Sequence, residues 1–113
     1  MMVESLADRS CVPCKGGTPP LNTEQSAALL SQLKGWQLED DRRLRKAYRF
    51  KNWIEAVDFV NAITPVAEAE GHHPDLNVSW GKVEAVLWTH KIGGLSESDF
   101  VMAAKLDRVF SSH

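Results

Sequence analysis

Apolar residues recur at helical spacing in three separate stretches of the chain. The first stretch begins at Thr23, whose hydroxyl can cap a helix. The second runs from Asn52 to Gly71, and Pro65 inside it should cause a kink or a break because proline removes a backbone hydrogen bond. The third begins at Ser96. The inward-facing apolar positions that this pattern predicts are Ala27, Leu30, Leu33, Trp53, Val57, Val60, Ala67, Phe100, Ala103, Ala104 and Phe110.

Two regions between these stretches alternate between apolar and polar residues, as strands do. In the first, Leu44 and Tyr48 alternate with arginines, which predicts a hairpin with one basic face. In the second, residues 76–80 and 83–90 are joined through Gly81 and Lys82, an arrangement that suits a type II′ turn. The order is helix, two strands, helix, two strands, helix. It predicts an α+β fold, in which helices cover one face of a four-stranded antiparallel sheet and leave the other face open.

The bulk composition is that of one ordinary globular domain. The chain has 113 residues, of which 43% are hydrophobic and 25% charged, and its formal net charge is -2. We expect a domain over residues 22–113, preceded by a flexible N-terminal tail over residues 1–21 that holds Cys11 and Cys14 in a Cys-x-x-Cys pattern. No apolar run suggests a signal peptide or a membrane span. The sequence therefore predicts a cytoplasmic protein with no membrane association, for which nucleic acid is an unlikely partner.

Three of the four histidines are the main candidates for chemistry. His72 and His73 follow the second helix, and His90 ends the last strand. Imidazole has an unperturbed pKa of about 6.5, so convergent histidines can donate and accept protons on one substrate. Glu68 precedes His72 by four residues, a spacing that places two side chains on the same helix face and would bring its carboxylate next to His72. The alternative is a set of separate surface histidines and an exposed glutamate.

A metal site is a competing interpretation, because three histidines and a carboxylate are a possible ligand set for zinc or iron. Adjacent histidines often point apart, however. The Cys11 and Cys14 pair would supply half of a zinc site, and the chain has no second cysteine pair to complete it. We therefore expect no bound metal and no cofactor.

Three sequence motifs occur in order along the chain. They are Glu68-x-x-x-His72-His73-Pro74, Val83-x-x-x-Leu87-x-Thr89-His90 and Gly94-Leu95-Ser96-x-x-Asp99. With these motifs the chain resembles the pterin-4a-carbinolamine dehydratase family from Gly35 to Ala104. One departure is Leu76, where the family often has an aromatic residue.

The resemblance implies a lyase that dehydrates a 4a-hydroxytetrahydropterin to quinonoid dihydropterin and water, and so recycles the pterin cofactor of aromatic amino acid hydroxylases. Its implied catalytic residues are His72, His73 and His90. The implied substrate-binding residues are Trp36, Glu68, Gly71, Trp88, Thr89, Lys91 and Asp99. Self-association as a homodimer or homotetramer is also implied. An alternative is a regulatory protein-binding module, because animal members of the family stabilise dimers of a transcription factor.

These roles can be stated as a hypothesis about proton transfer. His72 and His90 would exchange protons with the pterin from opposite sides of its ring. His73 and Glu68 would fix the polar edge of the pterin.

Overall fold

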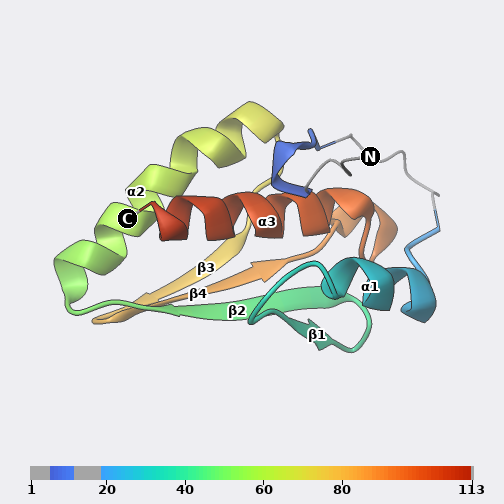
Figure 1. Ribbon diagram of the computed structural model, residues 1–113, viewed down its shortest axis with the longest axis horizontal. Helices are drawn as coiled ribbons and strands as arrows, with labels where there is room; N and C mark the ends of the chain where they lie inside the picture. The colour runs from blue at the N-terminus through green and yellow to red at the C-terminus, as the bar shows by residue number, and fades with distance from the viewer. Residues whose placement is uncertain (1–5, 12–18, 113) are drawn as a thin grey trace.

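The computed structural model describes residues 6–11 and 19–112 of the chain. Its elements, shown in Figure 1, are η1 (Leu6–Asp8), α1 (Thr23–Leu30), β1 (Gln37–Glu39), β2 (Arg43–Arg49), α2 (Trp53–Glu70), β3 (Asp75–Ser79), β4 (Lys82–Leu87), η2 (His90–Ile92) and α3 (Glu97–Ser111). The predicted α+β fold with four antiparallel strands and three α-helices is confirmed. Two short 3₁₀ helices are additional.

The sheet has the strand order β1-β2-β4-β3, and every neighbouring pair is antiparallel. Helices α2 and α3 lie side by side over one face of it (Figure 1). Alternate residues of the two central strands point into this layer and are fully or almost fully buried; they are Leu44, Tyr48, Val83, Ala85 and Leu87. The core therefore lies between the sheet and the two long helices.

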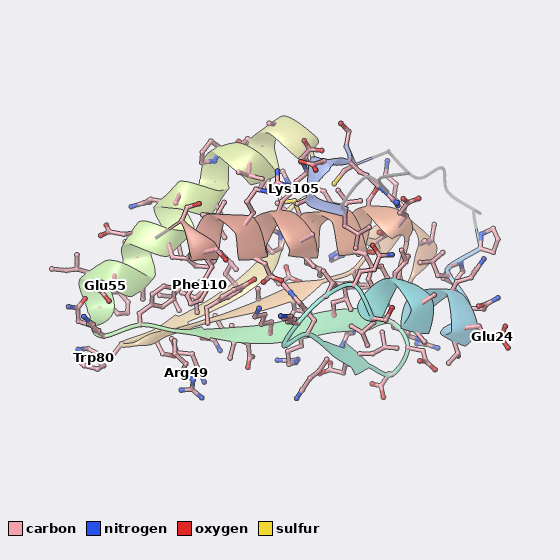
Figure 2. The ribbon with its side chains drawn as sticks, in the orientation of Figure 1. Glu24, Arg49, Glu55, Trp80, Lys105 and Phe110 are labelled. Carbon is pink, nitrogen blue, oxygen red and sulfur yellow. The ribbon has the colours of Figure 1, made fainter. Side chains whose placement is uncertain are left out.

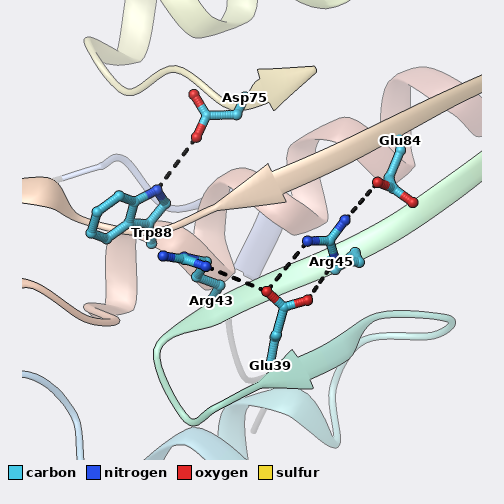
Figure 3. A network of polar contacts seen from close by, with 6 residues as sticks. All are labelled: Glu39, Arg43, Arg45, Asp75, Glu84 and Trp88. Atoms are coloured by element: carbon cyan, nitrogen blue, oxygen red, sulfur yellow. Dashed lines mark hydrogen bonds and ion pairs between the residues drawn. The ribbon is translucent and has the colours of Figure 1, made fainter. Parts of the chain in front are cut away.

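The other face of the sheet carries the predicted arginines, but glutamates compensate their charge. Arg45 lies between Glu39 and Glu84, with nitrogen–oxygen distances of 2.7 and 2.5 Å (Figure 3). Arg43 also contacts Glu39, at 3.5 Å. Around Arg43 and Arg45 the face is consequently a network of ion pairs rather than the basic surface that the sequence predicts. Strands β1 and β3 form the sheet edges, and the predicted self-association stays a prediction.

Helix α2 differs from its prediction in two ways. It continues without a break through Pro65, and it buries Ala56, Phe59, Ile63 and Ala67. The predicted inward residue Trp53 is instead 50% exposed. The reason is tertiary packing: Phe59 stacks against the buried ring of Tyr48 with a centroid distance of 4.7 Å. Local periodicity does not specify that contact.

At the C-terminal end of α3, Phe110 packs on the same aromatic group. Its ring lies 5.0 Å from Tyr48, 5.6 Å from Phe50 and 5.9 Å from Phe59, measured between centroids. Figure 2 shows Phe110 on the sheet side of α3. Its inward orientation is as predicted, although the residue is 36% exposed.

Two local features are corrected by the structure. Asn22 rather than Thr23 caps α1, and its side chain accepts the Gln25 N–H. The hairpin between β3 and β4 turns at residues 80–81, because Ser79 pairs with Lys82. Neither turn residue has a positive φ, which excludes a type II′ turn. Close packing explains the glycine: a Cβ at position 81 would lie 2.9 Å from the Phe50 carbonyl oxygen.

Part of the predicted tail belongs to the packed body of the molecule. Residues 6–11 lie against α3, where Leu6 is 3% exposed and the Lys105 ammonium donates to the Ala7 carbonyl at 2.9 Å. Arg108 pairs with Asp8 at 2.8 Å. These residues of the predicted tail thus contact α3, whereas Cys14 lies outside the described part of the chain, and the flexibility of the tail stays a prediction. Among the described residues, no helix is long and apolar enough to cross a membrane.

Candidate active site

A pocket of about 440 Å³ lies where three parts of the chain meet. These are the end of α2 with the turn that follows it, the segment after β4, and the start of α3. Seven of the predicted site residues line it: Gly71, His72, His73, Trp88, Thr89, His90 and Lys91. The structure thus brings together the three histidines that lie in two separate stretches of the sequence.

The backbone at Gly71 determines where His72 lies. Gly71 ends α2 in the left-handed conformation, with φ 64° and ψ 26°, and the His72 N–H donates back to the Ala67 carbonyl at 3.3 Å. This termination turns the chain out of the helix and toward the start of α3. There, Nε2 of His72 lies 2.6 Å from Oδ1 of Asp99.

Asp99 is fully buried and accepts hydrogen bonds on both oxygens. Its Oδ2 accepts the Thr89 hydroxyl at 2.8 Å and the Ser96 backbone N–H at 2.9 Å. The second bond is part of the capping arrangement predicted for the start of α3. These contacts fix the carboxylate, which in turn orients the His72 ring and leaves Nδ1 as the nitrogen available to a ligand. Asp99 does not itself line the pocket and is connected to it through His72.

Glu68 has a different partner from the one that the helical spacing predicts. Its Oε2 lies 2.7 Å from Nε2 of His73, not from His72. Both side chains are largely exposed, at 70% for Glu68 and 58% for His73. The i,i+4 rule requires the helix to continue through both residues, and α2 has already ended at Glu70. Glu68 thus contacts a pocket histidine without lining the pocket.

His90 lies against an aromatic surface. It begins the 3₁₀ helix η2 instead of ending a strand, and its ring stacks on Trp88 with a centroid distance of 3.9 Å and an interplanar angle of 31°. Trp88 donates from Nε1 to Asp75 at 3.4 Å, and the Arg43 guanidinium lies 5.0 Å from its ring centroid (Figure 3). The Trp88 ring is thus in contact with both the His90 imidazole and the Arg43 guanidinium, and these contacts fix its position in the pocket.

Trp36 does not take part in this pocket. It is buried, with 6% exposure, and its indole N–H donates to Asp107 at 3.0 Å. Asp107 also accepts the Tyr48 hydroxyl at 2.7 Å, and burial together with this carboxylate raises the pKa of Tyr48. Trp36 therefore belongs to a structural group outside the residues that line the pocket.

Several pocket residues were not predicted from the sequence, among them Cys11, Glu70, Asp75 and Ser98. Cys11 reaches the pocket because its backbone N–H donates to Glu70 at 2.7 Å. Burial and the neighbouring Glu70 carboxylate raise the pKa of the Cys11 thiol to about 11, so the thiol is neutral near pH 7. Cys11 and Ser98 are far from the histidine pair in sequence, so only contacts between distant segments reveal them, whereas Glu70 and Asp75 lie within two residues of that pair.

The arrangement of the described side chains can be compared with that of a metal site. In the part of the chain that the structure describes, no group of three or more histidine, cysteine, aspartate or glutamate side chains is arranged to hold a metal ion. The pocket histidines instead make contacts with Asp99, Glu68 and the Trp88 ring.

Comparison with known proteins identifies close relatives of the chain. Residues 19–109 match a family model described as pterin 4 alpha carbinolamine dehydratase. A putative pterin-4-alpha-carbinolamine dehydratase from Rubrobacter xylanophilus is 51% identical, covering 95% of this chain and all of that protein. A protein of the same description from Alkaliphilus metalliredigens is 50% identical, covering 94% of this chain and 96% of that protein.

Solved structures agree with these sequence matches. A transcriptional coactivator/pterin dehydratase from Brucella melitensis has a TM-score of 0.75 and 30% identity, with coverage of 80% of this chain and 97% of that one. A pterin dehydratase-like protein, described as a RuBisCO assembly factor in the alpha-carboxysome, has a TM-score of 0.57 and 22% identity, covering 68% of this chain and 94% of that one. The second likeness concerns the fold alone.

Proposed function

Because the chain belongs to the pterin-4a-carbinolamine dehydratase family, we propose that its pocket removes water from a 4a-hydroxytetrahydropterin by histidine acid–base catalysis. Membership in this family makes the chain a hydro-lyase that acts on a pterin. The finer proposal is that the product is a quinonoid dihydropterin and that the reaction recycles the cofactor of aromatic amino acid hydroxylases. The observation that carries the proposal is the buried Asp99 carboxylate on His72, in a pocket that His73 and His90 also line.

The proposed reaction needs one proton donor and one proton acceptor. The bond between C4a and the hydroxyl oxygen breaks, and the departing oxygen takes a proton to leave as water. The N5 lone pair forms the new C4a–N5 double bond, and the proton on N5 is lost to a base. The pocket gives one proton to the hydroxyl and takes one from N5, so its total number of protons is unchanged. The two groups then return to their starting protonation states by exchanging protons with water or with each other. General acid–base catalysis of this kind contributes about 10²- to 10⁴-fold to a rate.

His72 and His90 are the two groups that we assign to these transfers. Asp99 holds Nε2 of His72, so Nδ1 is the nitrogen that exchanges a proton with the pterin, and the buried carboxylate stabilises the imidazolium during that exchange. His90 is held by stacking on Trp88, and this contact fixes the position of its exposed imidazole. One ring donates while the other accepts.

The remaining predicted residues would bind the substrate. His73, oriented by Glu68, lies on the pocket lining and would contact the polar edge of the pterin. Trp88 would hold the His90 ring on which it stacks, and the backbone of Gly71, Thr89 and Lys91 would line the rest of the pocket. Glu68 and Asp99 act as positioning residues, each through the histidine that it contacts.

The test is a dehydration assay on His72→Ala and His90→Ala, with 4a-carbinolamine generated in situ by an aromatic amino acid hydroxylase. We expect kcat above the spontaneous rate to fall about 100-fold or more in each variant, with KM changed by less than about fivefold. Asn77→Ala is the control, because Asn77 is exposed on β3 and does not line the pocket. Wild-type kcat in both histidine variants would refute the assignment.

A regulatory protein-binding role is the second candidate, and the description of the Brucella relative as a coactivator favours it. Such a role does not require proton transfer. A strain carrying His72→Ala together with His90→Ala would then keep a regulatory phenotype that deletion of the whole protein removes. Loss of that phenotype in the double variant would assign it to dehydration instead.

A further inference from the structure

Glu70 is a pocket carboxylate that the proposed proton transfers do not use. It is the last residue of α2, and its side chain is 17% exposed. Oε1 accepts the Cys11 backbone N–H at 2.7 Å, and Oε2 lies 3.9 Å from the Lys105 ammonium. Figure 2 shows Lys105 projecting from α3 on the side of the N-terminal segment. Glu70 is thus held in place by two distant parts of the chain.

The chemistry of a pterin provides a partner for such a group. The pyrimidine ring of a pterin presents two adjacent hydrogen-bond donors, N3–H and the 2-amino group. A carboxylate presents two acceptor oxygens at matching separation and can accept both donors together. Partial burial strengthens such a charge-assisted pair relative to one in open water.

The other pocket acid fits this role less well. Asp75 is exposed, and one of its oxygens accepts the Trp88 indole N–H. An exposed carboxylate contributes little to binding because water competes for its lone pairs. Glu70 is more buried, and its position is fixed by the Cys11 N–H before any ligand arrives.

We propose that Glu70 determines specificity for pterins by accepting N3–H and the 2-amino group, with the 2-amino group facing Oε2. This inference rests on the proposed pterin-binding function of the same pocket. His73 would then contact an acceptor of the ring, such as the 4-carbonyl, while Glu70 binds the two donors. Cys11 contributes through its backbone N–H, which sets the orientation of the carboxylate.

Glutamine at this position makes a distinctive change. In Glu70→Gln the amide oxygen should stay on the Cys11 N–H, so the amide NH₂ takes the place of Oε2. That NH₂ would oppose the 2-amino group of a pterin. It would instead donate to the 2-oxo group of a lumazine, which has this oxygen in place of the 2-amino group and carries an added proton on N1. The variant should therefore lose its preference for the pterin or reverse it.

The experiment measures dissociation constants for 6-methylpterin and 6-methyllumazine by isothermal titration calorimetry. We expect the wild type to prefer the pterin and Glu70→Gln to reduce the pterin-to-lumazine preference about 10- to 100-fold. Glu97→Gln is the matched control, because Glu97 is an exposed acid that pairs with Arg9 and does not line the pocket. Asp75→Asn tests the rival acid.

Each result bears on the proposal in one direction. A reduced preference in Glu70→Gln alone supports it. The proposal is overturned if Glu70→Gln keeps the wild-type preference for pterin over lumazine, even where its affinities for both ligands fall equally. It is also overturned if Asp75→Asn loses that preference and Glu70→Gln does not. A wild type that dehydrates the carbinolamine while Glu70→Gln keeps the preference leaves the proposed function standing. A wild type that neither dehydrates nor binds the pterin removes both.

Discussion

Replacing Asp99 by asparagine exchanges one carboxylate oxygen for an NH₂ group and keeps the shape of the side chain. The amide oxygen can still accept the Thr89 hydroxyl and the Ser96 N–H, which both bind Oδ2 in the wild type. The NH₂ group then faces Nε2 of His72. Neutral His72 must accept there and carry its proton on Nδ1. The nitrogen assigned to proton exchange is consequently in the wrong tautomer.

The size of the effect follows from these contacts. Reversing the tautomer of a catalytic histidine lowers kcat by about 10²- to 10⁴-fold, while substrate binding changes little. The loss of one charge-assisted hydrogen bond to His72 should lower the free energy of unfolding by about 1 to 3 kcal/mol. The two bonds on the other oxygen are retained, so we expect a folded protein with low turnover.

The assay is steady-state dehydration, combined with thermal unfolding followed by circular dichroism. Asp107→Asn is a closely matched control, since Asp107 lies on the same helix and also accepts three donors, from Trp36, Lys46 and Tyr48. It should lose comparable stability and keep kcat within about twofold, because none of these residues lines the pocket. A kcat for Asp99→Asn no lower than that of Asp107→Asn would refute the reasoning.

Two further predictions concern the pocket wall. In a Cys14→Ser background, Cys11 of the folded protein should react with iodoacetamide at pH 8 roughly 100-fold more slowly than Cys11 of the urea-unfolded protein. The reason is that the rise in its pKa from 9.0 to about 11 reduces the thiolate fraction. Equal rates in the two states would contradict this. Gly71→Ala should lower the free energy of unfolding by about 1 to 2 kcal/mol, measured by urea titration, because φ at this position is 64°. The loss should come from backbone strain alone, since no atom lies within 4 Å of the added Cβ. Unchanged stability would show that the left-handed cap is not strained.

The elements that were predicted correctly are those whose signals are local. The start of α3 is set by Ser96 and Asp99, three residues apart, and the structure contains the predicted bond from the Ser96 N–H to the Asp99 carboxylate. The strand around Leu44 and Tyr48 alternates as predicted, because one face of the sheet is buried. Each of these predictions needs only neighbouring residues.

The features that the sequence did not predict depend on distant partners. Trp53 and Phe59 are both large and apolar, and only the position of Tyr48 across the core determines that Phe59 is the buried one. Trp36 is placed by its indole N–H, which must find an acceptor once buried and finds Asp107 on α3. Cys11 and Glu70 enter the pocket through a contact between residues 59 positions apart.

For His72, helical spacing predicts a different partner from the one that the structure shows. The i,i+4 rule pairs it with Glu68, but that rule assumes a helix that continues, and Gly71 ends the helix one residue earlier. The left-handed turn sends His72 to a buried carboxylate and leaves Glu68 to the exposed His73. The exchange matters for chemistry, because a fully buried acid with three donors holds a histidine in one orientation, whereas a 70% exposed glutamate is solvated and mobile in its rotamers. It follows that Gly71 shapes the pocket without offering a side chain, since its backbone conformation is what gives His72 a buried partner.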